Sequence, residues 1–109
     1  MSKYHAHKIT ANGEVFDSKK EYQRWLALQA MEAHGDIFEL RRQVPYELIP
    51  KQRGRYRTER PISYVADFVY TDRKTGEQIV EDVKGYRTPE YRMKRKMLLW
   101  RYGISILET

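Results

Sequence analysis

Two stretches with β-strand character, joined by a short polar turn, constrain the fold of this chain more than any other feature. Residues 62–70 and 77–84 are rich in Val, Ile, Tyr and Phe, and the turn at residues 71–76 ends in Gly76. Aromatic and β-branched runs separated by turn residues are typical of paired antiparallel strands. The pattern therefore predicts a hairpin over residues 62–84.

Helix signals lie on both sides of this hairpin. Ser18 and Glu21 have the spacing of a capping box, and apolar residues recur at helical intervals over residues 18–35. A second helix is expected over residues 89–102, because proline is favoured at the first helical position and glycine follows the last one. We expect its core side to consist of Met93, Met97 and Trp100.

Extended segments complete the pattern. Residues 37–49 are predicted to form a strand in which Pro45 indicates an edge or a bulge, residues 51–60 a basic loop, and residues 104–107 a final strand. Residues 1–16 are expected to form an irregular N-terminal arm with a turn at Asn12-Gly13. The order is α-β-β-β-α-β, and the helix before the last strand makes the third and last strands parallel neighbours in a mixed sheet flanked by helices.

Composition limits the class of protein. The chain has 109 residues, a length that fits one α/β domain over residues 1–109. It has no cysteine, which excludes disulfides, thiolate zinc sites and cysteine nucleophiles, and no apolar run long enough to span a membrane. Its net charge of +6 favours a polyanionic partner, with nucleic acid first and an anionic membrane surface second. The alternative is that this charge only keeps the protein in solution.

The hairpin carries acids where apolar residues are expected. Asp67 lies in the middle of one apolar strand, and Asp82 and Lys84 share one face of the next, because side chains alternate along a strand. If Asp67 faces the same side, two carboxylates and an ammonium converge. Such a pair of carboxylates suits a hard cation such as Mg²⁺ or Mn²⁺, which can polarise a phosphate oxygen and activate water. The alternative is a set of structural ion pairs.

These residues resemble a known superfamily. The pattern Asp67…Asp82-Val83-Lys84, on consecutive strands before a crossover helix, is similar to that of the PD-(D/E)XK nucleases. Four segments, at residues 16–21, 43–50, 64–70 and 80–85, more closely resemble a small phage-encoded family catalogued as a domain of unknown function. The resemblance covers residues 9–108, and the Glu-Asp-Val-Lys-Gly segment with its downstream Thr88 and Tyr91 is its most specific part.

The resemblance implies a restriction-endonuclease-like core and metal-dependent DNA cleavage, in the manner of Holliday-junction resolvases and related phage nucleases. It places metal ligands at Glu21, Asp67 and Asp82 and the catalytic lysine at Lys84. Ala66 stands where many members have proline, and Asp82 replaces the more frequent glutamate. Strand facing favours Asp82 over the adjacent Glu81 as the site acid. Glu21 is explained equally well as a helix cap.

Other residues are assigned to the surroundings of this site. Gln43 either lines it or faces solvent. The basic loop and the last helix are expected to follow the phosphate backbone of DNA, through Arg53, Arg55, Arg57, Arg60, Tyr86, Arg92, Lys94 and Lys96. The leading hypothesis is a Mg²⁺-dependent endonuclease acting on branched or recombination DNA, encoded by a phage or prophage and working in the bacterial cytoplasm, with a homodimer as a secondary expectation. The alternative is a non-catalytic basic DNA-binding module.

Overall fold

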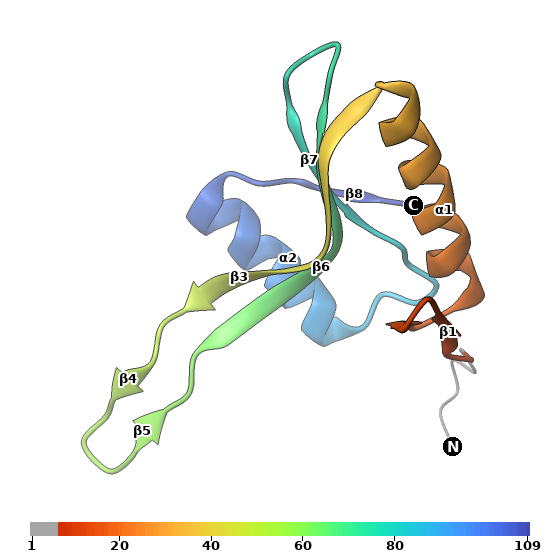
Figure 1. Cartoon of the computed structure of the whole chain (residues 1–109). Helices are drawn as coiled ribbons and strands as arrows, with labels where there is room; N and C mark the ends of the chain where they lie inside the picture. Colours follow the sequence, from red (N-terminus) through yellow and green to blue (C-terminus); the bar gives the residue numbers. More distant parts are fainter. Residues whose placement is uncertain (1–6) are drawn as a thin grey trace.

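The computed structural model describes residues 7–109, which form a mixed α/β arrangement of two helices, a four-stranded sheet and two small hairpins (Figure 1). The N-terminal hairpin and first helix are β1 Ile9–Ala11, β2 Glu14–Phe16 and α1 Lys19–His34. The middle of the chain forms β3 Ile37–Ile49, β4 Gln52–Arg53, β5 Thr58–Glu59, β6 Ile62–Asp72 and β7 Gln78–Asp82. The chain continues with α2 Pro89–Tyr102 and β8 Ile106–Glu108.

Both helices begin and end where their capping residues predict. Ser18 Oγ accepts a hydrogen bond from the Glu21 amide at 3.1 Å, and Thr88 Oγ1 accepts one from the Tyr91 amide at 3.0 Å. Gly35 and Gly103 follow the last turns with φ of 93° and 69°. This left-handed backbone is the usual reason for glycine at the end of a helix.

The main sheet has the strand order β3-β6-β7-β8. β6 pairs antiparallel with both β3 and β7, and β7 pairs parallel with β8, so the predicted hairpin and crossover are confirmed. Pro45 lies on the edge strand β3, as its missing N–H requires. β7 ends at Asp82, two residues before the predicted end, and β8 is shifted to Ile106–Glu108 by its pairing with β7.

The helices cover opposite faces of the sheet, and each has its own core. On the α1 face, the buried apolar residues are Leu28, Ile37, Phe68 and Tyr70. On the α2 face they are Leu48, Tyr64, Ala66, Val69, Val80, Tyr91 and Leu98. Asp82 belongs by strand alternation to the α2 face, with Val80, whereas Glu81 belongs to the α1 face.

The predicted core side of α2 is confirmed only at Met97, which is half-buried and packs against the α2-side core. Met93 is 57% exposed and Trp100 84% exposed, whereas Tyr91 and Leu98 are buried. Since an α-helix has 3.6 residues per turn, residues 91 and 98 lie on one side and Trp100 lies about half a turn away. The sheet therefore selects a different face of the helix from the one that apolar spacing favours.

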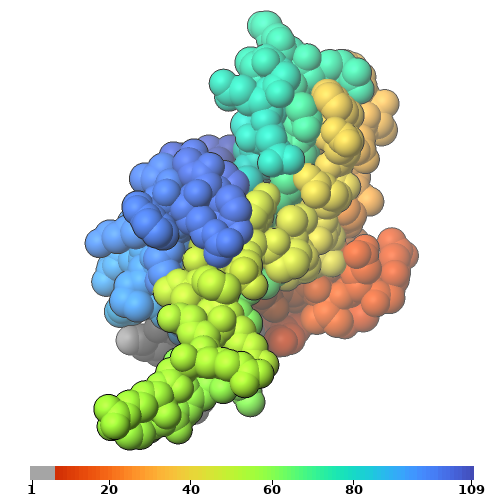
Figure 2. Space-filling model, turned by 90° about the vertical axis from the view of Figure 1, so that its left-hand side faces the viewer, coloured from red at the N-terminus to blue at the C-terminus, as the bar shows by residue number. Residues whose placement is uncertain are grey.

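The segment expected as a basic loop is a projecting hairpin, β4 with β5, which we call the arm (Figures 1 and 2). A Cβ at Gly54 would lie 2.9 Å from the Arg57 carbonyl oxygen, so the turn of the arm requires a glycine. The radius of gyration is 15.9 Å, against about 13 Å for a compact chain of this length.

The N-terminal segment is more regular than predicted. Residues 9–16 form the hairpin of β1 and β2 rather than an irregular segment, with the predicted turn at Asn12 and Gly13, where φ is 52° and 79°. Residues 1–6 of the predicted N-terminal arm lie outside the described residues. Neither helix of the described part is long and apolar enough to cross a bilayer.

Candidate active site

A cleft of about 420 Å³ lies where β6 and β7 separate, beside the N-terminal ends of both helices. The sheet opens here because β7 ends at Asp82, whereas β6 extends past this point toward the arm. The structure brings several predicted site residues together in the walls of this cleft, namely Gln43, Asp67, Asp82, Lys84 and Lys94.

Asp67 and Asp82 face each other across the β6–β7 pair. Phe68 pairs with Glu81, so the next step of the register places Asp67 opposite Asp82. The Val83 amide donates to Asp67 Oδ2 at 2.9 Å, and the Tyr64 hydroxyl donates to Asp82 Oδ2 at 2.6 Å. Each carboxyl is therefore held by a donor from its surroundings while the pair remains within hydrogen-bonding range.

This proximity changes the acidity of both groups. Burial and the neighbouring Asp67 carboxyl raise the pKa of Asp82 to about 8, although Tyr64 and Lys84 oppose the rise. Burial also raises the pKa of Asp67, against the lowering effect of its hydrogen bonds with Asp82 and the Val83 amide. Two carboxylates this close favour a shared proton or a bound cation.

Lys84 completes the charged part of the cleft. Its Nζ lies 3.3 Å from Asp82 Oδ2 and 4.0 Å from the centre of the Tyr91 ring, over the ring face. An ammonium over an aromatic face is attracted by the ring quadrupole. The side chain is 20% exposed, so Lys84 is held by Asp82 and Tyr91 while it still reaches the cleft.

Glu81 has a different environment from its neighbour Asp82. Its side chain is fully buried on the α1 face, where Arg24 Nε donates to Oε2 at 2.6 Å and the Tyr70 hydroxyl donates to Oε1 at 2.5 Å. None of its partners lines the cleft, so Glu81 is a structural acid. The facing argument from the sequence therefore selected the acid that lines the cleft.

Glu21 lies in the first turn of α1, where its carboxylate is buried and hydrogen-bonded. It is 3% exposed, its Oε1 accepts from the Asp17 amide at 3.1 Å, and Arg42 Nη2 lies 3.6 Å from the same oxygen. Burial is the main cause of the raised pKa of Asp67, and the charge of Glu21 is a smaller cause in the same direction. Glu21 does not line the cleft, so it contributes to the site through Asp67.

Gln43 lines the cleft with strained backbone, since its φ is 52° in the middle of β3. The register pairs Arg42 with Phe68 and Val44 with Ala66, and Gln43 lies between them opposite Asp67. Phe68 packs in the α1-side core, whereas Ala66 packs in the α2-side core. The β3–β6 ribbon thus changes face at this step, which brings Tyr64 to the side of Asp82.

The carboxylates form a row rather than a closed cage. Asp67 is the middle member, in range of both Glu21 and Asp82. Within residues 7–109, no group of three or more His, Cys, Asp or Glu side chains is arranged to hold a metal ion. The facing pair fits Mg²⁺ or Mn²⁺ nonetheless, because Mg²⁺ is commonly bound by one or two carboxylates together with water and substrate phosphates.

The predicted DNA-binding residues divide into three groups. Lys94 lines the cleft, where its Nζ lies 3.2 Å from Glu90 Oε1. Arg92 and Lys96 are exposed on α2 but do not line the cleft, and Tyr86 is 53% exposed in the loop before α2. The remaining cations lie on or at the base of the exposed arm, namely Arg53, Arg55, Arg57 and Arg60.

Sequence reasoning assigned no site role to Tyr64, Tyr91 and Asp17, which all contribute to the cleft. Tyr64 holds Asp82, Tyr91 supports Lys84, and Asp17 forms part of the wall beside α1. Regular alternation places Tyr64 on the face opposite Asp67, so the change of face at Gln43 concealed it. The N-cap signal at Thr88 could have identified Tyr91, because it places Tyr91 in the first turn of α2.

The comparisons with known proteins give a family but no activity. No curated protein and no solved structure matches the chain. A family model matches residues 1–106, and its description is "Protein of unknown function (DUF1064)". Because this match extends over nearly the whole chain, the protein belongs to that family of unknown function.

Proposed function

We propose that this protein is a Mg²⁺-dependent deoxyribonuclease that hydrolyses phosphodiester bonds in branched or recombination DNA. The observation that carries the proposal is the facing pair Asp67 and Asp82, with Lys84 Nζ 3.3 Å from Asp82, in an open cleft of a basic protein. A protein that only binds phosphate gains nothing from two carboxylates at the surface that DNA approaches.

The arrangement of elements supports the finer fold assignment. Without the two small hairpins, the order is α1, β3, β6, β7, α2 and β8, with β7 and β8 parallel. This is the order expected of a restriction-endonuclease-like core. In that assignment the two strands that carry Asp67 and Asp82 occupy the centre of the sheet.

The charged residues in and behind the cleft have distinct roles in this proposal. Asp67 and Asp82 hold the cation, and Glu21 orients Asp67 from behind the cleft wall. A bound Mg²⁺ supplies charge to polarise a phosphate oxygen and to activate water for attack. Lys84 positions the attacking water and stabilises the charge that develops on the phosphate, and Tyr91 fixes the ammonium that does so. Lys94 exchanges its contact with Glu90 for a phosphate oxygen.

The arm and the outer side of α2 hold the DNA backbone. They carry exposed arginines and lysines on either side of the cleft, which suits a partner recognised by shape and charge rather than by base sequence. A homodimer would let a chain of this size contact more than one arm of a branched substrate. The proposal includes this homodimer, an origin in a phage or prophage, and a location in the bacterial cytoplasm.

Cleavage assays test the proposal. Labelled four-way junction, duplex and single-stranded DNA are incubated with the full chain in Mg²⁺ or in EDTA. We expect cuts in Mg²⁺ only, abolished in Asp82→Asn and Lys84→Ala while DNA binding is retained. Asp36→Asn and Lys74→Ala, which change exposed residues away from the cleft, are the matched controls. Binding without cleavage of every substrate would favour the DNA-binding module and reject the nuclease.

A further inference from the structure

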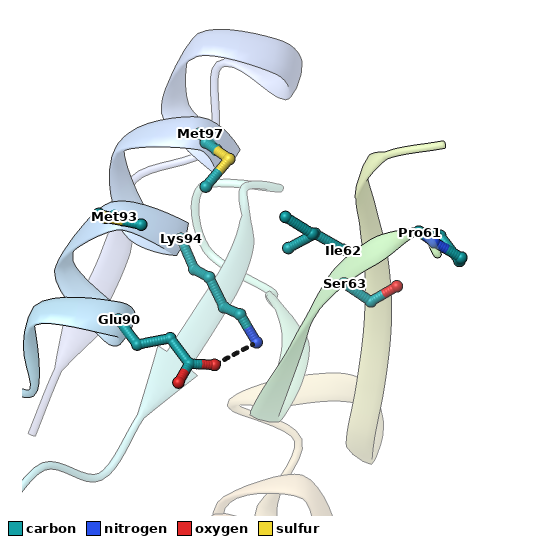
Figure 3. A pocket seen from close by; sticks show the side chains of 7 residues that line it. All are labelled: Pro61, Ile62, Ser63, Glu90, Met93, Lys94 and Met97. Atoms are coloured by element: carbon teal, nitrogen blue, oxygen red, sulfur yellow. Dashed lines mark ion pairs between the residues drawn. The ribbon is translucent and has the colours of Figure 1, made fainter. Parts of the chain in front are cut away.

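A second hollow lies beside the cleft, between the start of β6 and the side of α2 (Figure 3). We call it the groove; its volume is about 350 Å³. Its apolar walls come from Pro61 and Ile62 on one side and from Met93 and Met97 on the other. Ile62 is 38% exposed and Met93 57% exposed, so these walls are open to a ligand.

The groove and the cleft share a wall. Ser63, Glu90 and Lys94 line both, and Figure 3 shows the Glu90–Lys94 ion pair in the wall formed by α2. A ligand whose phosphate contacts Lys94 in the cleft would therefore have its neighbouring part directly over Ile62 and Met93. The cleft and the groove are therefore continuous, with the charged residues at the cleft end and the apolar residues at the groove end.

An apolar recess next to a phosphate-binding lysine matches the chemistry of a nucleotide. Nucleic-acid bases have flat apolar faces and polar edges, and they bind to proteins by stacking and apolar contact when they are unpaired. The flexible thioether of methionine adapts to such faces. The hydroxyl of Ser63 and the ion pair lie at the polar margin, where the sugar and phosphate would pass.

Charge argues against a second copy of this chain as the occupant. Arg60 immediately precedes Pro61 on one wall, Lys94 is paired with Glu90 on the other, and the chain as a whole has a net charge of +6. Two copies of a chain with this net charge repel each other, whereas a DNA strand is attracted by it.

We propose that the groove binds an unpaired base of the DNA strand whose phosphate lies in the carboxylate cleft. This inference rests on the proposed function and deepens it, because it identifies the substrate class. The preferred DNA has unpaired nucleotides beside the cut, such as a flap, a junction centre or a single strand. Continuous duplex, with its bases stacked, cannot fill the groove.

Binding without cleavage tests this inference. The probe is a short single strand carrying one 2-aminopurine, and the same probe in duplex form is the comparison, both in EDTA. We expect a fluorescence change in the single strand, and a decrease in affinity of about fivefold or more in Ile62→Ser and in Met93→Ser. Duplex affinity should change less than about twofold, because the protein contacts duplex through phosphate.

The control is Leu99→Ser, which removes a side chain that is 53% exposed on α2 but outside the groove. Thermal unfolding of each variant confirms that it folds. Equal decreases on both probes, or an equal decrease in the control, would overturn the inference. A wild-type dimer that dissociates in the groove variants, measured by sedimentation, would assign the groove to a second copy and also overturn it.

The two proposals fail in different ways. Selective single-strand binding without cleavage in Mg²⁺ supports the groove and rejects the nuclease. If both groove variants still cleave DNA and keep the wild-type preference for unpaired DNA, the groove does not bind a base, and the proposal of a nuclease is supported.

Discussion

Gln43 and Asp67 lie opposite each other at the step where the β3–β6 ribbon changes face, and Gln43 has the left-handed φ of 52° that accompanies the change. A non-glycine residue in this region carries strain of about 1–2 kcal/mol, which the surrounding structure has to offset. The β3–β6 ribbon thereby contributes side chains to both cores, and Asp67 lies where the ribbon changes face, beside the end of β7.

The strain at Gln43 can be measured through stability. We expect Gln43→Gly to match the wild type in stability or to exceed it by up to about 1 kcal/mol. The β-branched Gln43→Val should be less stable than the wild type by about 1–2 kcal/mol. Gln78→Gly, at an exposed position of β7 without positive φ, serves as the control and should cost about 0.5–1 kcal/mol. Urea unfolding gives these values, and equal destabilisation in both glycine variants would mean that Gln43 is not strained.

The neighbours Glu81 and Asp82 should respond oppositely to the removal of charge. Glu81→Gln disrupts a buried ion pair with Arg24 and should destabilise the fold by about 3 kcal/mol. Asp82→Asn removes the cost of burying this carboxyl beside Asp67, keeps an acceptor for Tyr64, and should stabilise the metal-free protein by about 1–2 kcal/mol. Denaturant unfolding in EDTA compares them, and marked destabilisation in Asp82→Asn would show that this acid is structural.

The raised pKa of Asp82 predicts how metal binding depends on pH. Because the folded pKa is about 8 and the ordinary value is 3.8, the folded state binds the proton more tightly, and this contribution to stability is lost as pH rises through 8. Cation binding needs the ionised form. Added Mg²⁺ should therefore raise the melting temperature more at about pH 9 than at about pH 6.

Scanning calorimetry with Mg²⁺ or EDTA at both pH values measures this difference. Asp82→Asn should remove the Mg²⁺ effect at either pH. An equal effect in Asp82→Asn and the wild type would place the cation elsewhere.

Glu108 controls a separate acid transition. The hydrogen bond from Tyr91 and the contacts with Arg87 and Arg95 lower its pKa to about 2, so its stabilising effect is lost as pH falls from 4.5 through 2. Glu108→Gln should cost about 1–2 kcal/mol at neutral pH and should remove part of the acid sensitivity in that range. Acid titration followed by circular dichroism checks it; unchanged acid unfolding in the variant would contradict the assignment.

The arm should act on DNA through charge alone. Arg55→Ala and Arg57→Ala should weaken binding similarly for all sequences and lower the salt dependence of log K by about one unit for each phosphate that the variant no longer neutralises. Lys74→Ala, in the turn between β6 and β7, should change neither quantity. Anisotropy titrations over a range of salt concentrations measure the slope, and an unchanged slope in the arm variants would exclude the arm from the DNA interface.

The predictable parts of this structure are those specified by neighbouring residues. Capping by Ser18 and Thr88 locates both helices, and strand alternation separates Asp82 from Glu81. The rotation of α2 was not predictable, because the sheet rather than the helix pattern decides that Leu98 is buried and Trp100 exposed. Tyr64 was missed because nothing in a glutamine signals left-handed backbone at Gln43.

The isolation of the arm has a consequence for the integrity of the chain. β4 and β5 pair only with each other, and their connecting residues are exposed and rich in arginine, so trypsin should cut there first. The two fragments would remain associated through the β3–β6 ladder. One fragment supplies Glu21 and Gln43, and the other supplies Asp67, Asp82 and Lys84. A protein split at the arm should therefore reassemble its cleft from two separately made pieces.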